Sequence, residues 1–266
     1  MPNNTAIIYT EKDHVATITF NRPDAGNVIN QQLAQELEDI CHQINRDDNI
    51  YVAVIIGAGD KAFCDGDELE RQLRTARIRR SSMAKPNDFP RQFSIASAVA
   101  AIDRPVIAAI NGDALGQGLE LALSCDIRLA SERAHFGLLQ VASGLLPMDG
   151  GTQRLPRIVG RSKALELILT ANIIDAAEAL AIGLVNRVVP HKNLTAETEI
   201  LAQNIASKAP IALRYLKEAV NQGLDLTLEQ GLRLEADLYF LLHTTADRTE
   251  GIKAFLGKRP PEFKGR

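Results

Sequence analysis

The chain has 266 residues and a formal net charge of -3, with 45% hydrophobic and 24% charged residues. This composition excludes a disordered or fibrous protein, because a chain of this length and apolar content can bury a large core. The slight negative charge argues against a general binder of nucleic acid or of an anionic membrane surface.

The cysteines and the start of the chain bear on the compartment. The chain has three cysteines, Cys41, Cys64 and Cys125, which is an odd number, and they form no CxxC pair. This fits a reducing compartment better than a disulfide framework. The N-terminal residues show no basic segment followed by an apolar stretch, and no window reaches the roughly 18 apolar residues of a membrane span. We therefore expect a cytoplasmic protein without a secretion signal or membrane span.

Strand and helix patterns alternate along the first two thirds of the chain. Apolar residues alternate with period two before Arg22-Pro23, then recur at helical spacing, and then form short continuous runs typical of buried strands. The predicted strands are His14–Asn21, Val52–Ile56, Pro105–Ile110 and Asp126–Ala130, and the predicted helices are Asn30–Asn45, Phe93–Ile102 and Gly116–Leu123. This repetition predicts an α/β fold with a mainly parallel sheet covered by helices.

Beyond about Ala177 the chain is mostly helical. A helix over Ala177–Leu184 and a short strand over Val185–Val189 precede a series of amphipathic helices. These helices are Leu194–Ala206, Ile211–Gln222 and Leu228–Leu242. Their apolar stripes must pack on the core or on a neighbouring subunit. We therefore divide the chain into an α/β core over residues 1–190 and a helical region over residues 191–266.

A glycine-rich turn between a strand and a helix is the most informative local feature. Gly112, Gly116 and Gly118 let the backbone approach a ligand, and free N–H groups at the helix start can stabilise an oxyanion. The spacing fits neither a dinucleotide fingerprint nor a Walker loop, so an ordinary turn is the alternative. Glu120 follows among apolar residues, which favour a raised pKa and a role in acid/base catalysis. The alternative is that its charge complements the dipole at the start of the helix.

Other chemistries find less support. A second glycine-bearing turn, Phe63–Leu69, also lies between a strand and a helix, so two turns can supply two N–H donors. The five histidines form no HxxxH or HExxH pair, which argues against a metal site. No GxSxG motif surrounds a serine, and a structural role is the default for Cys64.

Three ordered motifs resemble the crotonase, or enoyl-CoA hydratase/isomerase, superfamily. They are KAFCDGDEL (Lys61–Leu69), AAINGDALGQGLELALSCDIRLASERAHFG (Ala108–Gly137) and GLLPMDGGTQRLPRIVG (Gly144–Gly160). The resemblance runs from about Val15 to Glu262 and implies a spiral of ββα units with a helical C-terminal trimerisation region. It also implies a homotrimer or dimer of trimers and an acyl-CoA thioester substrate, with no cofactor besides the coenzyme A of the substrate.

The resemblance also assigns site residues. It places an oxyanion hole at the backbone N–H groups of Asp67 and Gln117, and the first acid/base glutamate of hydratases at Glu120. The coenzyme A contacts that it implies are Lys61, Ala62, Phe63, Asp65, Gly66 and Leu69, together with Phe263 and Lys264 near the C-terminus.

Two positions depart from the common hydratase pattern. The second glutamate falls on Gln140, whose amide cannot donate or take a full proton at neutral pH. Asp149, in the turn before the next predicted helix, is our candidate replacement. The alternative is that Asp149 caps the helix that begins near Gly150.

We therefore expect an enoyl-CoA hydratase that uses the oxyanion hole, Glu120 and Asp149, with Gln140 bonded to water or substrate. The changed acid position suggests an unusual acyl group, such as a cyclic or conjugated dienoyl group. A double-bond isomerase and a non-catalytic acyl-CoA-binding paralogue are the alternatives.

Overall fold

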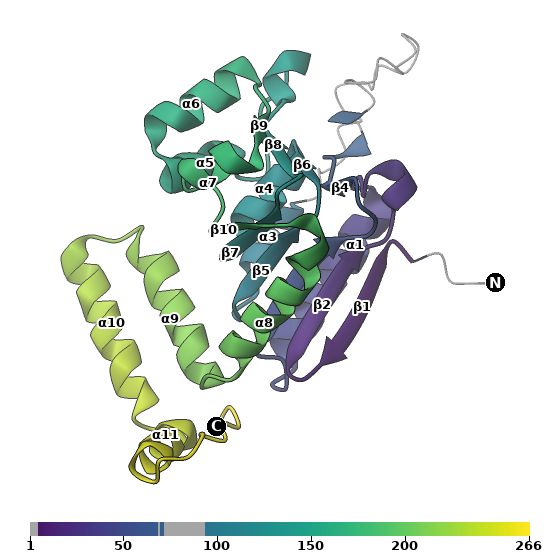
Figure 1. The fold of residues 1–266 in the computed structure, drawn as a ribbon. Coiled ribbons are helices and arrows are strands. Elements are labelled where there is room, and N and C mark those ends of the chain that lie inside the picture. The colour runs from purple at the N-terminus through teal and green to yellow at the C-terminus, as the bar shows by residue number, and fades with distance from the viewer. Residues whose placement is uncertain (1–4, 69, 72–93) are drawn as a thin grey trace.

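The computed structural model describes residues 5–68, 70–71 and 94–266 and folds them around two β-sheets (Figure 1). The strands of the larger sheet, in spatial order, are β1 (Ile7–Lys12), β2 (Val15–Phe20), β3 (Val52–Gly57), β5 (Val106–Ile110), β7 (Ile127–Ser131) and β10 (Arg187–Val189). β1 is antiparallel to β2, and the other neighbouring strands of this sheet are parallel.

The smaller sheet consists of short strands. In spatial order they are β4 (Ala62–Cys64), β6 (Asp113–Leu115), β8 (His135–Gly137) and β9 (Ile174–Asp175). β4, β6 and β8 each follow a strand of the larger sheet along the chain and run parallel to one another, whereas β9 is antiparallel to β8. Helical segments follow these strand pairs, so the chain repeats a strand-strand-helix unit. The predicted α/β spiral is therefore confirmed.

Helices cover both faces of the larger sheet (Figure 1). The described helices are α1 (Gln31–Arg46), α3 (Ile95–Ala100), α4 (Gln117–Ser124), α5 (Gly151–Val159), α6 (Arg161–Thr170), α7 (Ala176–Ala181), α8 (Leu194–Ala206), α9 (Pro210–Gly223), α10 (Leu228–Leu242) and α11 (Ala246–Leu256), with 3-10 turns at Pro23–Ala25, Gln140–Ser143 and His191–Asn193. In β3, Ala53 and Ile55 belong to the apolar cluster that includes α1, whereas Val52 and Val54 belong to the cluster that includes α8. Because successive strand residues face opposite sides, this double cover requires a continuous apolar run.

The C-terminal helices extend away from the two sheets (Figure 1). α9 and α10 form a hairpin, and α11 lies with the C-terminus beyond its end. These helices expose large apolar side chains, among them Leu216, Val220, Leu224, Leu232 and Phe240. Exposed apolar side chains that lie together are typical of surfaces that contact another molecule. None of the described helices is long and apolar enough to cross a membrane.

All predicted strands and helices are present, with most ends shifted by one or two residues. The helix expected near Gly150 is α5, and the mostly helical tail continues to α11. The prediction missed β1, whose residues are mostly exposed beyond Ile7, and the helix α6. It also missed every strand of the smaller sheet. Each of those strands has two or three residues, which is too short for a periodic apolar pattern to appear.

Gly118 determines how closely α4 approaches the end of β4. A Cβ on Gly118 would lie 2.0 Å from the backbone oxygen of Cys64 and 2.9 Å from its Cβ, so one of the two elements would have to shift. We expect Gly118→Ala to lower the free energy of unfolding by about 3 kcal/mol. Gly223→Ala is the matched control, because nothing lies within 4 Å of its Cβ, and it should change stability by less than about 1 kcal/mol. Chemical denaturation compares them, and equal midpoints would contradict the prediction.

Candidate active site

Two backbone N–H groups from separate turns converge on one oxygen. Asp67 follows β4, and Gln117 is the first residue of α4. The parallel pairing of β4 with β6, which precedes α4, brings these two turns together. The N–H groups of Asp67 and Gln117 donate to Oε2 of Glu70 at 3.2 and 3.0 Å. Two fixed donors aimed at one oxygen form an arrangement that can stabilise an oxyanion.

Two glycines make room for that oxygen. Gly66 and Gly116 have φ angles of 83° and 54°, in the left-handed region that favours glycine. A Cβ on Gly66 or Gly116 would lie 2.2 or 2.1 Å from Oε2 of Glu70. The glycines therefore provide both the backbone conformation of the turns and the space between the two N–H groups.

Glu70 is a site residue that the sequence analysis missed. Its side chain is folded back over Asp67, and the residue is 8% exposed. Asp67 Oδ1 accepts the N–H of Glu70 at 2.7 Å, while Glu70 Oε2 accepts the N–H of Asp67. This reciprocal pair is a capping box for the helical turn that begins at Glu68. The Asp-x-x-Glu spacing in the sequence was a signal for the capping box, although not for the contact with Gln117.

Glu120 lies in the first turn of α4 and is 1% exposed. Its Oε1 accepts the N–H groups of Asp149 and Gly151, both at 2.8 Å, and its Oε2 accepts Nε2 of Gln140 at 3.1 Å. Burial raises the pKa of Glu120 to about 7, against the two backbone hydrogen bonds, which lower it. Because Oε1 already has two N–H donors, Oε2 is the oxygen that can carry a proton.

The raised pKa of Glu120 predicts a pH-dependent stability. The carboxyl group has an ordinary pKa of 4.5 and a folded-state pKa of about 7, so the folded state binds more protons between these values. Stability should therefore fall as pH rises through this window, by about 3 kcal/mol in total. Urea unfolding of the wild type and Glu120→Gln at pH 4.5 and pH 8 isolates this group, because glutamine does not titrate. A stability difference that stays constant with pH would contradict the prediction.

Gln140 holds a buried acceptor beside Glu120. The residue is 4% exposed, and its Nε2 donates to Glu120, which sets the orientation of the amide. Within the described part of the chain, its Oε1 is buried without a hydrogen-bond partner. A buried acceptor of this kind costs free energy until a donor reaches it. Oε1 of Gln140 is therefore suited to accept a hydrogen bond from water or a ligand.

Asp149 is 5% exposed and is held by three donors. Its Oδ1 accepts Oγ of Ser94 at 3.1 Å, and its Oδ2 accepts the N–H of Ala96 at 2.8 Å and Nε2 of Gln117 at 3.1 Å. Ala96 lies in the first turn of α3, so the carboxylate caps that helix. The alternative that Asp149 caps the helix near Gly150 is wrong, because the first N–H of α5, that of Gly151, donates to Glu120, and the Asp149 carboxylate accepts from α3 and Gln117 instead.

One cavity, with a volume of about 70 Å³, joins these groups. It brings together the predicted residues Asp67, Gln117, Glu120, Gln140 and Asp149. The lining residues that the sequence analysis missed are Glu70, Ser94, Leu145, Leu146 and Met148. A cavity with carboxyl groups, fixed N–H donors and apolar side chains can orient an apolar substrate and move its protons.

The predicted coenzyme A contacts near the hole differ in accessibility. They are Lys61, Ala62, Phe63, Asp65, Gly66 and Leu69. Lys61 is exposed and Asp65 is half-buried, whereas Gly66 lies in the hole. Ala62 and Phe63 are buried in β4, and the Phe63 ring packs against the core, so only their backbone can meet a ligand. Leu69 lies outside the described residues.

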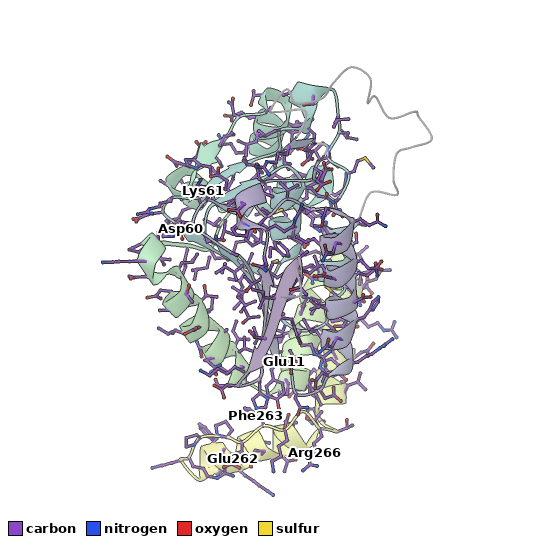
Figure 2. The ribbon with its side chains drawn as sticks, turned by 90° about the vertical axis from the view of Figure 1, so that its right-hand side faces the viewer. Glu11, Asp60, Lys61, Glu262, Phe263 and Arg266 are labelled. Carbon is purple, nitrogen blue, oxygen red and sulfur yellow. The ribbon has the colours of Figure 1, made fainter. Side chains whose placement is uncertain are left out.

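The two predicted contacts near the C-terminus lie far from these residues. Figure 2 shows Phe263 at one end of the molecule and Lys61 toward the other. The N–H of Lys264 donates to Oδ1 of Asp247 at 2.7 Å, which holds the tail against α11. The structure therefore does not bring Phe263 and Lys264 to the oxyanion hole of the same chain.

The described residues of the site form no metal-binding cluster and carry no exposed thiol. Among residues 5–68, 70–71 and 94–266, no three His, Cys, Asp or Glu side chains are arranged to hold a metal ion. Cys41, Cys64 and Cys125 are buried, free thiols. Burial raises the pKa of all three, which makes them poor nucleophiles at neutral pH.

Known proteins resemble the chain over nearly its whole length. The family model described as enoyl-CoA hydratase/isomerase matches residues 10–266. The chain is 38% identical to a crotonyl-CoA hydratase of Syntrophomonas wolfei, over 97% of both chains. It is also 38% identical to the (E)-benzylidenesuccinyl-CoA hydratase of Thauera aromatica, over 95% of this chain and 96% of the other. A crystal structure of an enoyl-CoA hydratase from Bacillus anthracis matches with a TM-score of 0.89 at 40% identity, covering 98% of this chain and 100% of that one. The chain therefore belongs to the enoyl-CoA hydratase/isomerase family.

Proposed function

We propose that this protein adds water across the carbon–carbon double bond of an enoyl-CoA thioester. The observation that carries the proposal is the convergence of the Asp67 and Gln117 N–H groups beside the buried carboxyl group of Glu120. The similar proteins described above include hydratases of crotonyl-CoA and (E)-benzylidenesuccinyl-CoA, which supports the same reaction class.

In the proposed reaction, the thioester oxygen accepts hydrogen bonds from Asp67 and Gln117. Attack of water on the β-carbon moves electron density onto this oxygen and produces an enolate-like state. The two N–H groups already point to one place, so they stabilise the growing charge without rearranging. Each such donor contributes on the order of 3 kcal/mol to the stability of the transition state.

Glu120 and Gln140 are the proposed partners of the attacking water. Oε1 of Gln140 accepts one hydrogen bond from the water, which satisfies this buried acceptor. Oε2 of Glu120 takes the proton that the water loses as its oxygen bonds to the β-carbon. A pKa of about 7 suits Glu120 to this step, because it can both accept and release a proton at neutral pH.

Asp149 is the proposed partner for the proton at the α-carbon. It lines the same cavity, and its N–H is bonded to Glu120. Among the described residues, one donor reaches its Oδ1 and two reach its Oδ2. Oδ1 is therefore the oxygen better able to hold the proton that is exchanged with the α-carbon. In this step Asp149 starts protonated and Glu120 starts ionised. The α-carbon gains the proton of Asp149 while Glu120 gains one from water, and transfer of that proton from Glu120 to Asp149 restores the site.

We propose that the protein acts as a homotrimer or a dimer of trimers. The exposed apolar side chains of α9–α11 offer a surface for contacts between copies. Phe263 and Lys264 could meet a coenzyme A bound near Asp67 only from another copy, since they lie at the other end of their own chain (Figure 2). We propose that the enzyme works in the cytoplasm, without a nucleic-acid or membrane partner.

A panel of straight-chain and cyclic enoyl- and dienoyl-CoA thioesters tests the proposed reaction. Products are separated by chromatography and identified by mass spectrometry, with Glu120→Gln as the control protein. Addition of one water by the wild type alone supports hydration and names the acyl group. A product of unchanged mass and shifted retention would replace the proposal with isomerisation. Binding of the thioesters without any product would indicate a non-catalytic acyl-CoA-binding protein.

A further inference from the structure

A side chain of the protein itself occupies the point between the two oxyanion-hole donors. Oε2 of Glu70 accepts both N–H groups, from Asp67 at 3.2 Å and from Gln117 at 3.0 Å. A thioester oxygen that used the hole would need the same two donors. The space between Gly66 and Gly116 is filled by Oε2 of Glu70, since a Cβ on either glycine would lie within 2.2 Å of that oxygen. A second oxygen therefore cannot occupy the same point.

Local structure explains why the Glu70 carboxylate stays there. The capping box with Asp67 folds the side chain back over the start of its own helical turn. The N–H of Gln117 adds a second, charge-assisted hydrogen bond from α4, on a segment 47 residues away in the sequence. Glu70 is therefore held by both turns that form the hole.

We infer that Glu70 is an internal ligand of the oxyanion hole, which the thioester oxygen of an acyl-CoA must displace before it can bind there. This inference rests on the proposed use of the hole by a thioester. Coenzyme A without an acyl group has no carbonyl oxygen at this point and does not compete with Glu70. The contact therefore weakens binding of the thioester group specifically.

Displacement of Glu70 also changes the surroundings of Glu120. The carboxylate of Glu70 is one of the charges that raise the pKa of Glu120. When the side chain leaves the hole, this repulsion decreases and the ionised form of Glu120 becomes more favourable. Entry of the substrate thus favours the protonation state that accepts a proton from water.

Calorimetric titration of butyryl-CoA tests the inference, because this saturated thioester binds without being hydrated. We expect Glu70→Ala to lower its Kd about tenfold, which corresponds to an open hole in about one tenth of the wild-type molecules. Glu70→Gln keeps a side chain that can form the capping box but removes the charge that strengthens the bond from Gln117. It should therefore lower the Kd of butyryl-CoA at least about threefold, and it tests the inference even if Glu70→Ala folds poorly.

Glu68→Ala is the matched control. Glu68 carries the same charge on the same turn, but its carboxylate is exposed and bonded to Nη2 of Arg22 at 3.1 Å. Its removal should leave the Kd of butyryl-CoA within about twofold of the wild type, and no variant should change the Kd of free coenzyme A by more than that. Equal gains for Glu68→Ala, or for free coenzyme A, would overturn the inference in favour of general repulsion of the phosphates.

An unchanged Kd of butyryl-CoA in both Glu70 variants would overturn the inference about Glu70. It would leave the proposed function intact, since the wild type would still bind the thioester. Absence of butyryl-CoA binding in every protein would overturn the proposed function together with it. Loss of hydration with intact binding would affect the proposed function only, because the titration needs no turnover.

Discussion

Glu120→Gln is expected to lower kcat for enoyl-CoA hydration about 1,000-fold, within the range that general acid–base groups contribute. The amide cannot take the proton that water loses as it attacks the β-carbon. The fold should persist, because the oxygen of glutamine can still accept the N–H groups of Asp149 and Gly151. Steady-state hydration of the thioester identified in the panel measures the loss. Titration of butyryl-CoA, with a Kd within about threefold of the wild type, shows that binding is retained.

The pH dependence of kcat/KM in the wild type tests whether Glu120 acts as the base in hydration. Hydration needs ionised Glu120, so kcat/KM in this direction should rise as pH increases through about 7. Dehydration of the product needs protonated Glu120 to release the hydroxyl group, so its kcat/KM should fall over the same range. Profiles of the same sign in both directions, or more than a tenth of the wild-type kcat in Glu120→Gln, would contradict the role assigned to Glu120.

The larger sheet was predictable from the sequence because its central strands are covered on both faces. Such strands need continuous apolar runs of five or six residues, as in Val52–Gly57 and Val106–Ile110. The smaller sheet was not predictable in this way, since its strands are only two or three residues long. Their positions follow from parallel pairing at the ends of the longer strands, which local periodicity does not record.

The residues of the site were likewise predictable only where their role follows from neighbours in the sequence. Glu120 was predictable, because its apolar neighbours already favour a raised pKa. The contacts of Glu70 and Asp149 were not, because they depend on pairs far apart in the sequence. Gln117 and Glu70 are 47 residues apart, and Ser94 and Asp149 are 55 residues apart. Only folding of the spiral places these side chains on one cavity.

Asp149→Asn should separate proton transfer at the α-carbon from the attack of water. We expect kcat for hydration to fall about 100-fold, because the amide cannot exchange a proton with the α-carbon. The fold should be retained, since the oxygen of asparagine can accept the N–H of Ala96 and Nε2 of Gln117 while its NH₂ group donates to Oγ of Ser94.

Exchange of the α-protons of butyryl-CoA in D₂O tests that step without any attack by water. In this reaction the α C–H bond breaks, Asp149 takes the proton, the two N–H groups stabilise the enolate, and a deuteron returns to carbon. Glu120→Gln should therefore keep most of the exchange, whereas Asp149→Asn should lose it. Ser94→Ala removes one of the three donors to Asp149, and it should lower exchange by less than about tenfold if Asp149 acts on the substrate directly. The opposite pattern, with exchange lost in Glu120→Gln and kept in Asp149→Asn, would assign the α-proton to Glu120 and leave Asp149 as the residue that holds Gln117 and α3 in place.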